Sequence, residues 1–255
     1  IKVPDAYKGK GIFYSNGYGS YVELPANKYI CYIDKLKWNM DEESLTLGDE
    51  IAIGKGSQFI SVHPSQDSLS FMAKTAFYSL KDYVIHANGV NDIGIADAII
   101  YPDSGVVTIA KNAKIETLYG ATILADDLTE YHTFVNSSVD IISANNYKAS
   151  GDYTYKDALN NNQKVFFNKI SVNADTITIA EGNITSDQEF HLDSRFDFKG
   201  DIELISDHKN LIFDGFFMTN HSCDLIEKKW IKFRSDIDPM NIIFILEDKI
   251  YSDQD

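Results

Sequence analysis

The sequence predicts an all-β fold, namely an elongated β-solenoid or β-jellyroll built from repeated two-strand units. Three observations lead to this prediction. Short runs alternate between apolar and polar residues, glycines recur at equal steps, and helical periodicity is scarce. The chain of 255 residues also contains 15 Tyr and 15 Phe but only 5 Pro, a composition that favours pleated surfaces over long helices.

The alternation has a period of two residues, which places one set of side chains on a buried face and the other set in solvent. It is clearest in residues 83–88, 170–175 and 202–205, where Ile85, Ile170 and Ile202 belong to the apolar set. The best helical candidates are short, and they cover residues 41–47 and 223–229. Strands are therefore expected to supply nearly all of the regular structure.

Four glycines are separated by equal steps of 31 residues. They are Gly89, Gly120, Gly151 and Gly182, and three of them stand in an Ala-x-Gly context. A glycine with positive φ closes a tight turn between alternating strands, so each unit is expected to contain two strands and a turn. We interpret the chain as one domain, 1–255, with a soft boundary near residues 66–70 between an irregular part, 1–70, and the repeat region, 71–255.

The charge balance narrows the possible partners. With 44% hydrophobic and 24% charged residues the chain has a globular composition, and its formal net charge is −15. This charge repels phosphate backbones, so nucleic acid is excluded as an expected partner. Anionic lipid headgroups are disfavoured for the same reason, although an apolar groove could still hold acyl chains.

No stretch of the sequence is long and apolar enough to predict a transmembrane segment. The chain begins at Ile1 without a signal pattern, and we interpret it as a processed or excised piece. Cys31 and Cys223 are the only cysteines, with no C-x-x-C spacing, so a metal site is not expected. One disulfide between them and two independently buried thiols both remain open.

Residues 71–155 resemble the repeats of OstA-like domains, the jellyroll or β-taco units of Gram-negative lipopolysaccharide-transport proteins, and the resemblance implies a β-taco-like form of the predicted jellyroll. The similarity rests on Ala73, Ala76, Tyr78, residues 85–90 and 95–98, Ala125-Asp126, Ala174-Asp175, and residues 198–204 and 211–215. Trp38 and residues 66–69 and 147–151 are similar to segments of very large envelope proteins that contain such units.

The resemblance implies strands that stack into an open groove shielding acyl chains, and units that join end to end as a bridge. It further implies lipid, lipopolysaccharide or other envelope proteins as partners, and an extracytoplasmic location in the periplasm or at the outer membrane of a Gram-negative bacterium. No ligand-binding residue can be carried over from the family.

Histidines and glycine-rich loops give no catalytic or nucleotide-binding motif. None of the six histidines forms an H-x-H or H-E-x-x-H pattern with a neighbour. They are His63, His86, His132, His191, His208 and His221. We expect His86 to face solvent on its strand. Residues 54–57, Gly-Lys-Gly-Ser, lack the closing Gly-Lys-Ser/Thr of a phosphate loop, so nucleotide binding is excluded.

Carboxylates and tyrosines supply two further candidates. Asp193, Asp197 and Asp201 would share one face of an extended segment, either as a calcium site or glycosidase-like pair or as solvated strand residues. Tyr147 and the pair Tyr153 and Tyr155 could form a row that binds glycans, or they could fill a β-core. Two triplets, Asp-Ser-Leu at 67–69 and Asp-Thr-Ile at 175–177, resemble a short acceptor motif for O-glycosylation.

The sequence thus assigns no catalytic, cofactor-binding or metal-binding residue and no cofactor. We predict a non-enzymatic envelope scaffold, bridge or amphiphile-binding groove. The alternatives are an adhesin or glycan-binding module and a carbohydrate-active β-helix enzyme. Each hypothesis predicts a different feature. The scaffold or groove predicts an open apolar groove, the glycan-binding module predicts an exposed flat row of aromatic side chains, and the enzyme predicts two carboxylates that converge in a cleft.

Overall fold

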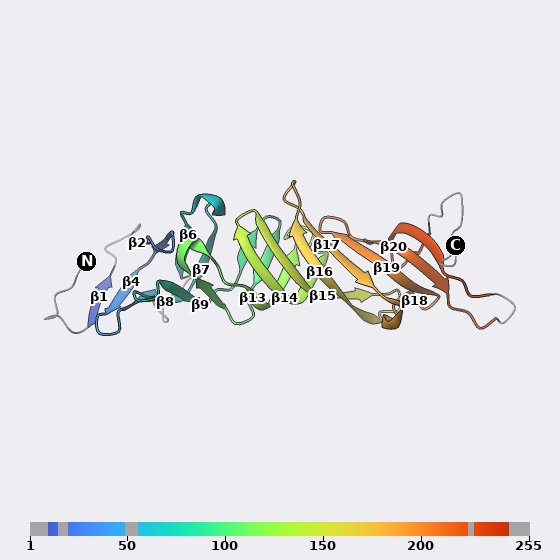
Figure 1. The fold of residues 1–255 in the computed structure, drawn as a ribbon, viewed down its shortest axis with the longest axis horizontal. Helices are drawn as coiled ribbons and strands as arrows, with labels where there is room; N and C mark the ends of the chain where they lie inside the picture. Colours follow the sequence, from blue (N-terminus) through green and yellow to red (C-terminus); the bar gives the residue numbers. More distant parts are fainter. Residues whose placement is uncertain (1–9, 15–19, 49–55, 224–226, 245–255) are drawn as a thin grey trace. The chain divides into compact units, whose positions relative to one another are not determined.

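Antiparallel β-strands provide nearly all of the regular structure (Figure 1). A computed structural model describes residues 10–14, 20–48, 56–223 and 227–244. Within these ranges there are three short 3-10 helices and no α-helix, which confirms the prediction of an all-β fold. None of the helices in the described ranges is long and apolar enough to cross a membrane.

The chain divides into two compact units, which are described separately below. The first comprises Ile1–Ile123 and Ser138–Tyr147, and the second comprises Leu124–Ser137 and Lys148–Asp255. Whether the chain acts as the single domain expected from its sequence stays a prediction.

The first unit contains two sheets made of strands of four or five residues. The six-stranded sheet has the order β1-β4-β5-β8-β9-β12, and the four-stranded sheet has the order β2-β3-β6-β7. The strands are β1 (Lys10–Tyr14), β2 (Tyr21–Leu24), β3 (Tyr29–Tyr32), β4 (Lys35–Asn39), β5 (Ser44–Gly48), β6 (Ser57–Ser61), β7 (Ser70–Ala73), β8 (Thr75–Ser79), β9 (Val84–Asn88) and β12 (Val106–Ile109).

A third sheet follows the order β10-β11-β13-β14-β15-β16-β17-β19-β20-β21, with β18 paired to β19. Its strands are β10 (Ile93–Ile95), β11 (Ala98–Tyr101), β13 (Leu118–Ala125), β14 (His132–Ser143), β15 (Asn146–Lys156), β16 (Asn162–Val172), β17 (Thr178–Ile184), β18 (His191–Asp193), β19 (Phe196–Ile205), β20 (Leu211–Thr219) and β21 (Ile231–Ile237). The 3-10 helices are η1 (Pro64–Gln66), η2 (Lys111–Ala113) and η3 (Ser186–Gln188).

The predicted alternation determines which face of each strand is buried. Ile85 and Ala87 on β9 and Ile202 on β19 are buried, whereas His86 is exposed as expected. Tyr83 departs from the pattern because it precedes β9 in a left-handed conformation, with φ 58°, and is 40% exposed. The alternation therefore holds within the strands and fails where a turn reverses the chain.

Two buried side-chain amides hold the turns of the first unit together. The Nδ2 group of Asn27 donates hydrogen bonds to the carbonyl oxygens of Tyr83, Ile109 and Ala110 at 2.8, 3.0 and 3.1 Å. The Nε2 group of Gln66 in η1 donates to the carbonyl oxygen of Ala113 at 2.7 Å. A buried carbonyl without a partner is costly, so these amides stabilise turns that lie far apart in the sequence.

The helix predicted at residues 41–47 is wrong. Residues 41–43 form a turn in which Glu43 has a φ of 47°, and Ser44 then begins β5. Leu45 and Leu47 pair with Tyr78 and Ala76 of β8, so sheet hydrogen bonding overrides the weak helical pattern. Of the helix predicted at 223–229, residues 224–226 lie outside the described residues, and the flanking residues are not helical.

The four equally spaced glycines do not share one role. Gly89 follows β9 with a φ of 69°, as a turn requires, and Gly120 has a φ of 71° inside β13. The turns predicted at Gly120, Gly151 and Gly182 are wrong, because these residues lie within β13, β15 and β17. In β15 and β17 the missing side chain permits close packing: a Cβ at Gly151 would collide with the Ser137 side chain, and a Cβ at Gly182 would approach the Phe166 carbonyl oxygen to 3.0 Å.

Gly215 provides a test of this close packing, because it pairs with Gly200 across β19 and β20. A Cβ at Gly215 would lie 2.7 Å from the Gly200 Cα and would collide with the Lys199 carbonyl oxygen. Since both obstacles are backbone, Gly215→Ala should lower the free energy of unfolding by about 2 kcal/mol in urea denaturation. The control Gly94→Ala has no atom within 4 Å of its new Cβ and should change stability little. Equal effects of the two variants would contradict this account.

Candidate functional site

Aromatic rings fill the inner face of the C-terminal strands in the second unit. Phe198 on β19 and Phe213 on β20 meet edge to face, with centroids 5.0 Å apart and an interplanar angle of 85°. Phe190 lies 5.1 Å from the ring of Tyr155 on β15. All four side chains are buried. Edge-to-face packing of this kind stabilises a core beyond the area that it buries.

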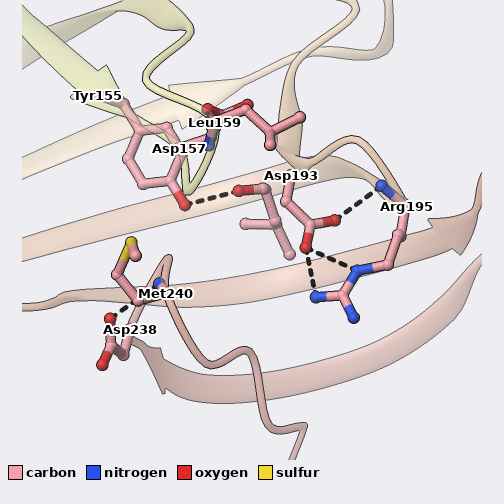
Figure 2. Close-up of polar contacts among 8 residues, drawn as sticks. Tyr155, Asp157, Leu159, Asp193, Arg195, Asp238 and Met240 are labelled. Atoms are coloured by element: carbon pink, nitrogen blue, oxygen red, sulfur yellow. Dashed lines mark hydrogen bonds and ion pairs between the residues drawn. The ribbon is translucent and has the colours of Figure 1, made fainter.

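Tyr155 joins this aromatic core to a group of aspartates, as Figure 2 shows. Its hydroxyl donates a hydrogen bond to the Leu192 carbonyl oxygen at 2.9 Å. Burial raises the pKa of the Tyr155 hydroxyl, and the negative charges of Asp193 and Asp157 raise it further. The phenol therefore stays protonated and acts as a hydrogen-bond donor.

Each aspartate in Figure 2 closes its own turn. The carboxylates of Asp157, Asp193 and Asp238 accept the backbone N–H two residues ahead, at 2.9, 2.7 and 2.9 Å respectively. This is the Asx turn, in which a side-chain oxygen replaces a backbone acceptor. Asp126 after β13 and Asn173 after β16 make the same contact. Five strand ends in the second unit, those of β13, β15, β16, β18 and β21, are thus followed by side-chain-capped turns.

Asp157 and Asp193 are each held by more than one donor. Burial disfavours the charged Asp157 carboxylate, but hydrogen bonds from the side chain and N–H of Asn161 and the N–H of Leu159 outweigh it and lower its pKa. Asp193 is buried and forms an ion pair with Arg195, whose Nε lies 2.8 Å from the carboxylate. The partners of both carboxylates lie within their own turns, which is typical of carboxylates that stabilise a turn.

The predicted face of Asp193, Asp197 and Asp201 does not form. Residues 193–201 are not one extended segment, because Asp193 ends β18 and the chain turns before β19. Asp197 instead contacts His191 Nδ1 at 2.6 Å, and Asp201 is exposed and accepts a hydrogen bond from Asn183 at 2.7 Å. Within the described residues no group of three potential metal ligands is present.

The predicted row of Tyr147, Tyr153 and Tyr155 is not an exposed platform. Tyr147 and Tyr155 are buried, and burial raises the pKa of Tyr153 to about 12. Tyr153 and Tyr155 do point to the same face of β15, but that face is the core, where Tyr153 lies 5.8 Å from Phe167. The interpretation of these residues as core-filling aromatics is confirmed.

The histidine side chains have different local partners. His63 caps η1 by accepting the N–H of Ser65, and His86 lies 3.2 Å from the Thr108 hydroxyl. His208 contacts Asp207, and His221 Nδ1 accepts the N–H of Cys223. His132 is buried at the start of β14, where its Nε2 lies 2.6 Å from the His208 carbonyl oxygen and its Nδ1 lies 3.1 Å from the Tyr153 hydroxyl.

The two cysteines are unbonded. Cys31 is fully buried on β3, where burial raises the pKa of its thiol, whereas Cys223 is exposed. The prediction that the two thiols are not bonded to each other is confirmed, but the prediction that both are buried is wrong.

The two triplets that resemble an O-glycosylation motif, at 67–69 and 175–177, lie in turns. Ser68 and Thr176 are exposed, with φ values of 58° and 61°. Residues 54 and 55 of the glycine-rich run lie outside the described residues.

A pocket with a volume of about 300 Å³ lies beside η3. Its lining includes Gln163, Lys164 and Glu189 together with the apolar side chains of Ile184 and Phe190. The Gln163 amide bonds to both the N–H and the carbonyl oxygen of His191, at 2.8 and 2.6 Å. This amide thus occupies the free edge of the short strand β18.

Sequence reasoning missed Asp157, Asp238 and Arg195. A recognisable signal was present for two of them, because Asp157 and Asp238 directly follow alternating runs that become β15 and β21. An aspartate at that position is a common start of a turn. Arg195 has no comparable signal, since its partner Asp193 was assigned to an extended segment.

Comparisons of the chain with protein-family models, curated proteins and solved structures found no match. The functional proposals below therefore rest on the arrangement of residues within each unit and on the resemblance of the sequence to OstA-like repeats.

The buried His132 predicts how stability depends on pH. Burial lowers its pKa below 6.5, against the opposing effect of the hydrogen bond to His208, so the unfolded chain binds a proton more readily than the folded chain. Its contribution to stability is complete above the unfolded value of about 6.5 and is lost as pH falls through the folded pKa. Urea denaturation between pH 7.5 and 5 should show His132→Gln to be less pH-dependent than the wild type. The control His86→Gln, at an exposed position, should show the same change of stability with pH as the wild type. If stability depends on pH equally in the wild type and both variants, His132 is not the source of the dependence.

Proposed function

We propose that this chain is a non-enzymatic scaffold module of the cell envelope, with the finer architecture of a β-solenoid or OstA-like jellyroll. The observation that carries the proposal is the use of the buried carboxylates. Asp157 and Asp193 each hold a turn at the end of a strand. A catalytic pair would need carboxylates that face a shared cleft, at a separation suited to glycoside hydrolysis.

The packed aromatic core also supports a mechanical role. Rings such as Phe198 and Phe213 fill the inner face of the sheet, and side-chain-capped turns fix the ends of its strands. The envelope location rests on the resemblance to OstA-like repeats. Fractionation of native cells should recover the chain with the envelope, and its recovery in the cytosol would contradict that location.

Asp193 and Asp201 test the scaffold assignment as a matched pair. Asp193→Ala removes the buried carboxylate that accepts the backbone N–H of Arg195 and should lower the free energy of unfolding by about 2 kcal/mol. Asp201→Ala, at an exposed position with one hydrogen bond to Asn183, should have little effect. Incubation of the wild type with polysaccharides should release no reducing ends. Release that Asp193→Asn abolishes would instead identify an enzyme.

Amphiphile binding is the second candidate function, and the position of Phe244 favours it. Its ring stacks on Phe217 with a centroid distance of 3.9 Å and an interplanar angle of 6°, and it meets Phe233 edge to face at 4.9 Å. The segment that carries it is held by a hydrogen bond of 3.3 Å from the Ser235 hydroxyl to the Ile243 carbonyl oxygen. One ring thus covers apolar surface that an acyl chain could occupy.

Removal of the Phe244 ring tests this candidate. Phe244→Ala should expose the ring of Phe217 and raise the fluorescence of bound anilinonaphthalene sulfonate about threefold or more, because an apolar patch becomes accessible. Met240→Ala, which shortens a side chain that is already 75% exposed, should leave the signal unchanged. Circular dichroism checks that each variant is folded. Phe244→Leu removes the ring but keeps a large apolar side chain, so it perturbs the fold less than Phe244→Ala. An unchanged signal in folded Phe244→Ala and Phe244→Leu would exclude the site.

A further inference from the structure

The outward face of the four-stranded sheet in the first unit carries a row of side chains in register. Tyr21 on β2 pairs with Tyr32 on β3, Tyr32 pairs with Gln58 on β6, and Gln58 pairs with Met72 on β7. Because paired residues on neighbouring strands point to the same face, the four side chains form one line across the sheet. With strands about 4.8 Å apart, the line is about 14 Å long, which suits a short oligosaccharide.

The opposite face of this sheet is core, so the row is turned to solvent. Cys31 and Phe59, which alternate with Tyr32 and Gln58, are fully buried. Tyr21 is 52% exposed and Tyr32 is 39% exposed. Two neighbouring aromatic side chains on one exposed surface leave apolar area in contact with water, and a ligand that covers this area gains free energy by removing it from water.

The two tyrosine rings offer complementary surfaces to a sugar. Their centroids are 5.8 Å apart and their planes are tilted by 53°. A pyranose can place its C–H groups on the face of one ring while the other ring contacts its edge. The tyrosine hydroxyls and the exposed Gln58 amide supply donors and acceptors for sugar hydroxyls.

Charge indicates what kind of ligand fits. The row of four has no charged side chain, and the row beside it on the same face, formed by Glu23, Ile30, Ile60 and Ser70, has one. The chain as a whole carries a formal charge of −15, which repels polyanions. A single carboxylate gives little attraction for a basic peptide. A neutral, polyhydroxylated ligand matches a neutral surface of aromatic and amide groups.

The outward face of the six-stranded sheet in the same unit gives a contrast. There Phe77 on β8 is 40% exposed, and its neighbours in register are Thr46 on β5 and His86 on β9. Phe77 thus lies between the hydroxyl of Thr46 and the polar imidazole of His86, without a second Tyr, Phe or Trp ring beside it. Other aromatic side chains are exposed as well, such as Tyr119 at 74% and Phe166 at 51%. What distinguishes Tyr21 and Tyr32 is that two exposed rings lie in contact with each other on one sheet face.

We propose that Tyr21, Tyr32 and Gln58 form a binding site for neutral oligosaccharides on the outward face of the four-stranded sheet. The site goes beyond the scaffold function, since it would attach the module to a polysaccharide. Tyr21 and Tyr32 stack on sugar rings, and Gln58 bonds to their hydroxyls.

Retention on insoluble polysaccharides tests the site, with cellulose, chitin and starch as probes and cello-, chito- and maltohexaose as soluble competitors. The wild type should be retained on at least one polysaccharide and released by the matching hexaose. Tyr21→Ala and Tyr32→Ala should each weaken binding about tenfold, because each removes a stacking surface. Phe77→Ala, which removes an equally exposed ring from the other sheet, should bind as the wild type does.

Three results of the retention assay would overturn the proposal. They are no retention of the wild type on any of the three polysaccharides, an equal loss of binding in Phe77→Ala, and retention that no hexaose reduces. Sedimentation velocity adds a readout for a different occupant: a wild-type dimer that Tyr32→Ala converts to monomer would show that this face binds a second copy of the chain instead. Thermal unfolding of each variant ensures that only folded protein is compared.

Discussion

Capture of backbone N–H groups by side-chain oxygens is the interaction on which the second unit depends. A long strand that leaves a sheet exposes main-chain groups that need partners. At five strand ends a side-chain oxygen accepts a backbone N–H of the following turn. The residues that supply it are Asp126, Asp157, Asn173, Asp193 and Asp238. The aromatic core can then pack against strands with fixed ends. In the first unit the amides of Asn27 and Gln66 meet the same requirement for buried carbonyl oxygens.

The fold class could be predicted because alternation is a local property. The positions that alternate, such as Ile85 and Ala87, are buried as the pattern requires. The role of a glycine is not local in this way. Gly89 is required by its own φ, whereas Gly151 is required by the Ser137 side chain on a neighbouring strand. Equal spacing along the chain cannot separate these causes, so the turns inferred from it were only partly correct.

The candidate sites depend even more on pairing between strands. Asp193 was correctly selected as a notable residue, but its partner Arg195 is two residues away in a turn. The expected partners Asp197 and Asp201 lie on the next strand. Tyr21 and Tyr32 meet only because the hairpin of β2 and β3 sets their register. A slip of one residue would send one of these rings to the core face. Sequence alone gives the chemical groups, and register decides which of them meet.

The two cysteines give the chain an internal reporter of its own opening. Cys223 is exposed, while Cys31 lies in the core of the first unit with a thiol pKa raised by burial. A thiol-reactive dye therefore labels the native protein at one position and reaches the second only when β3 becomes accessible. The rate at which the second label appears would measure the breathing of the first unit, without any engineered residue.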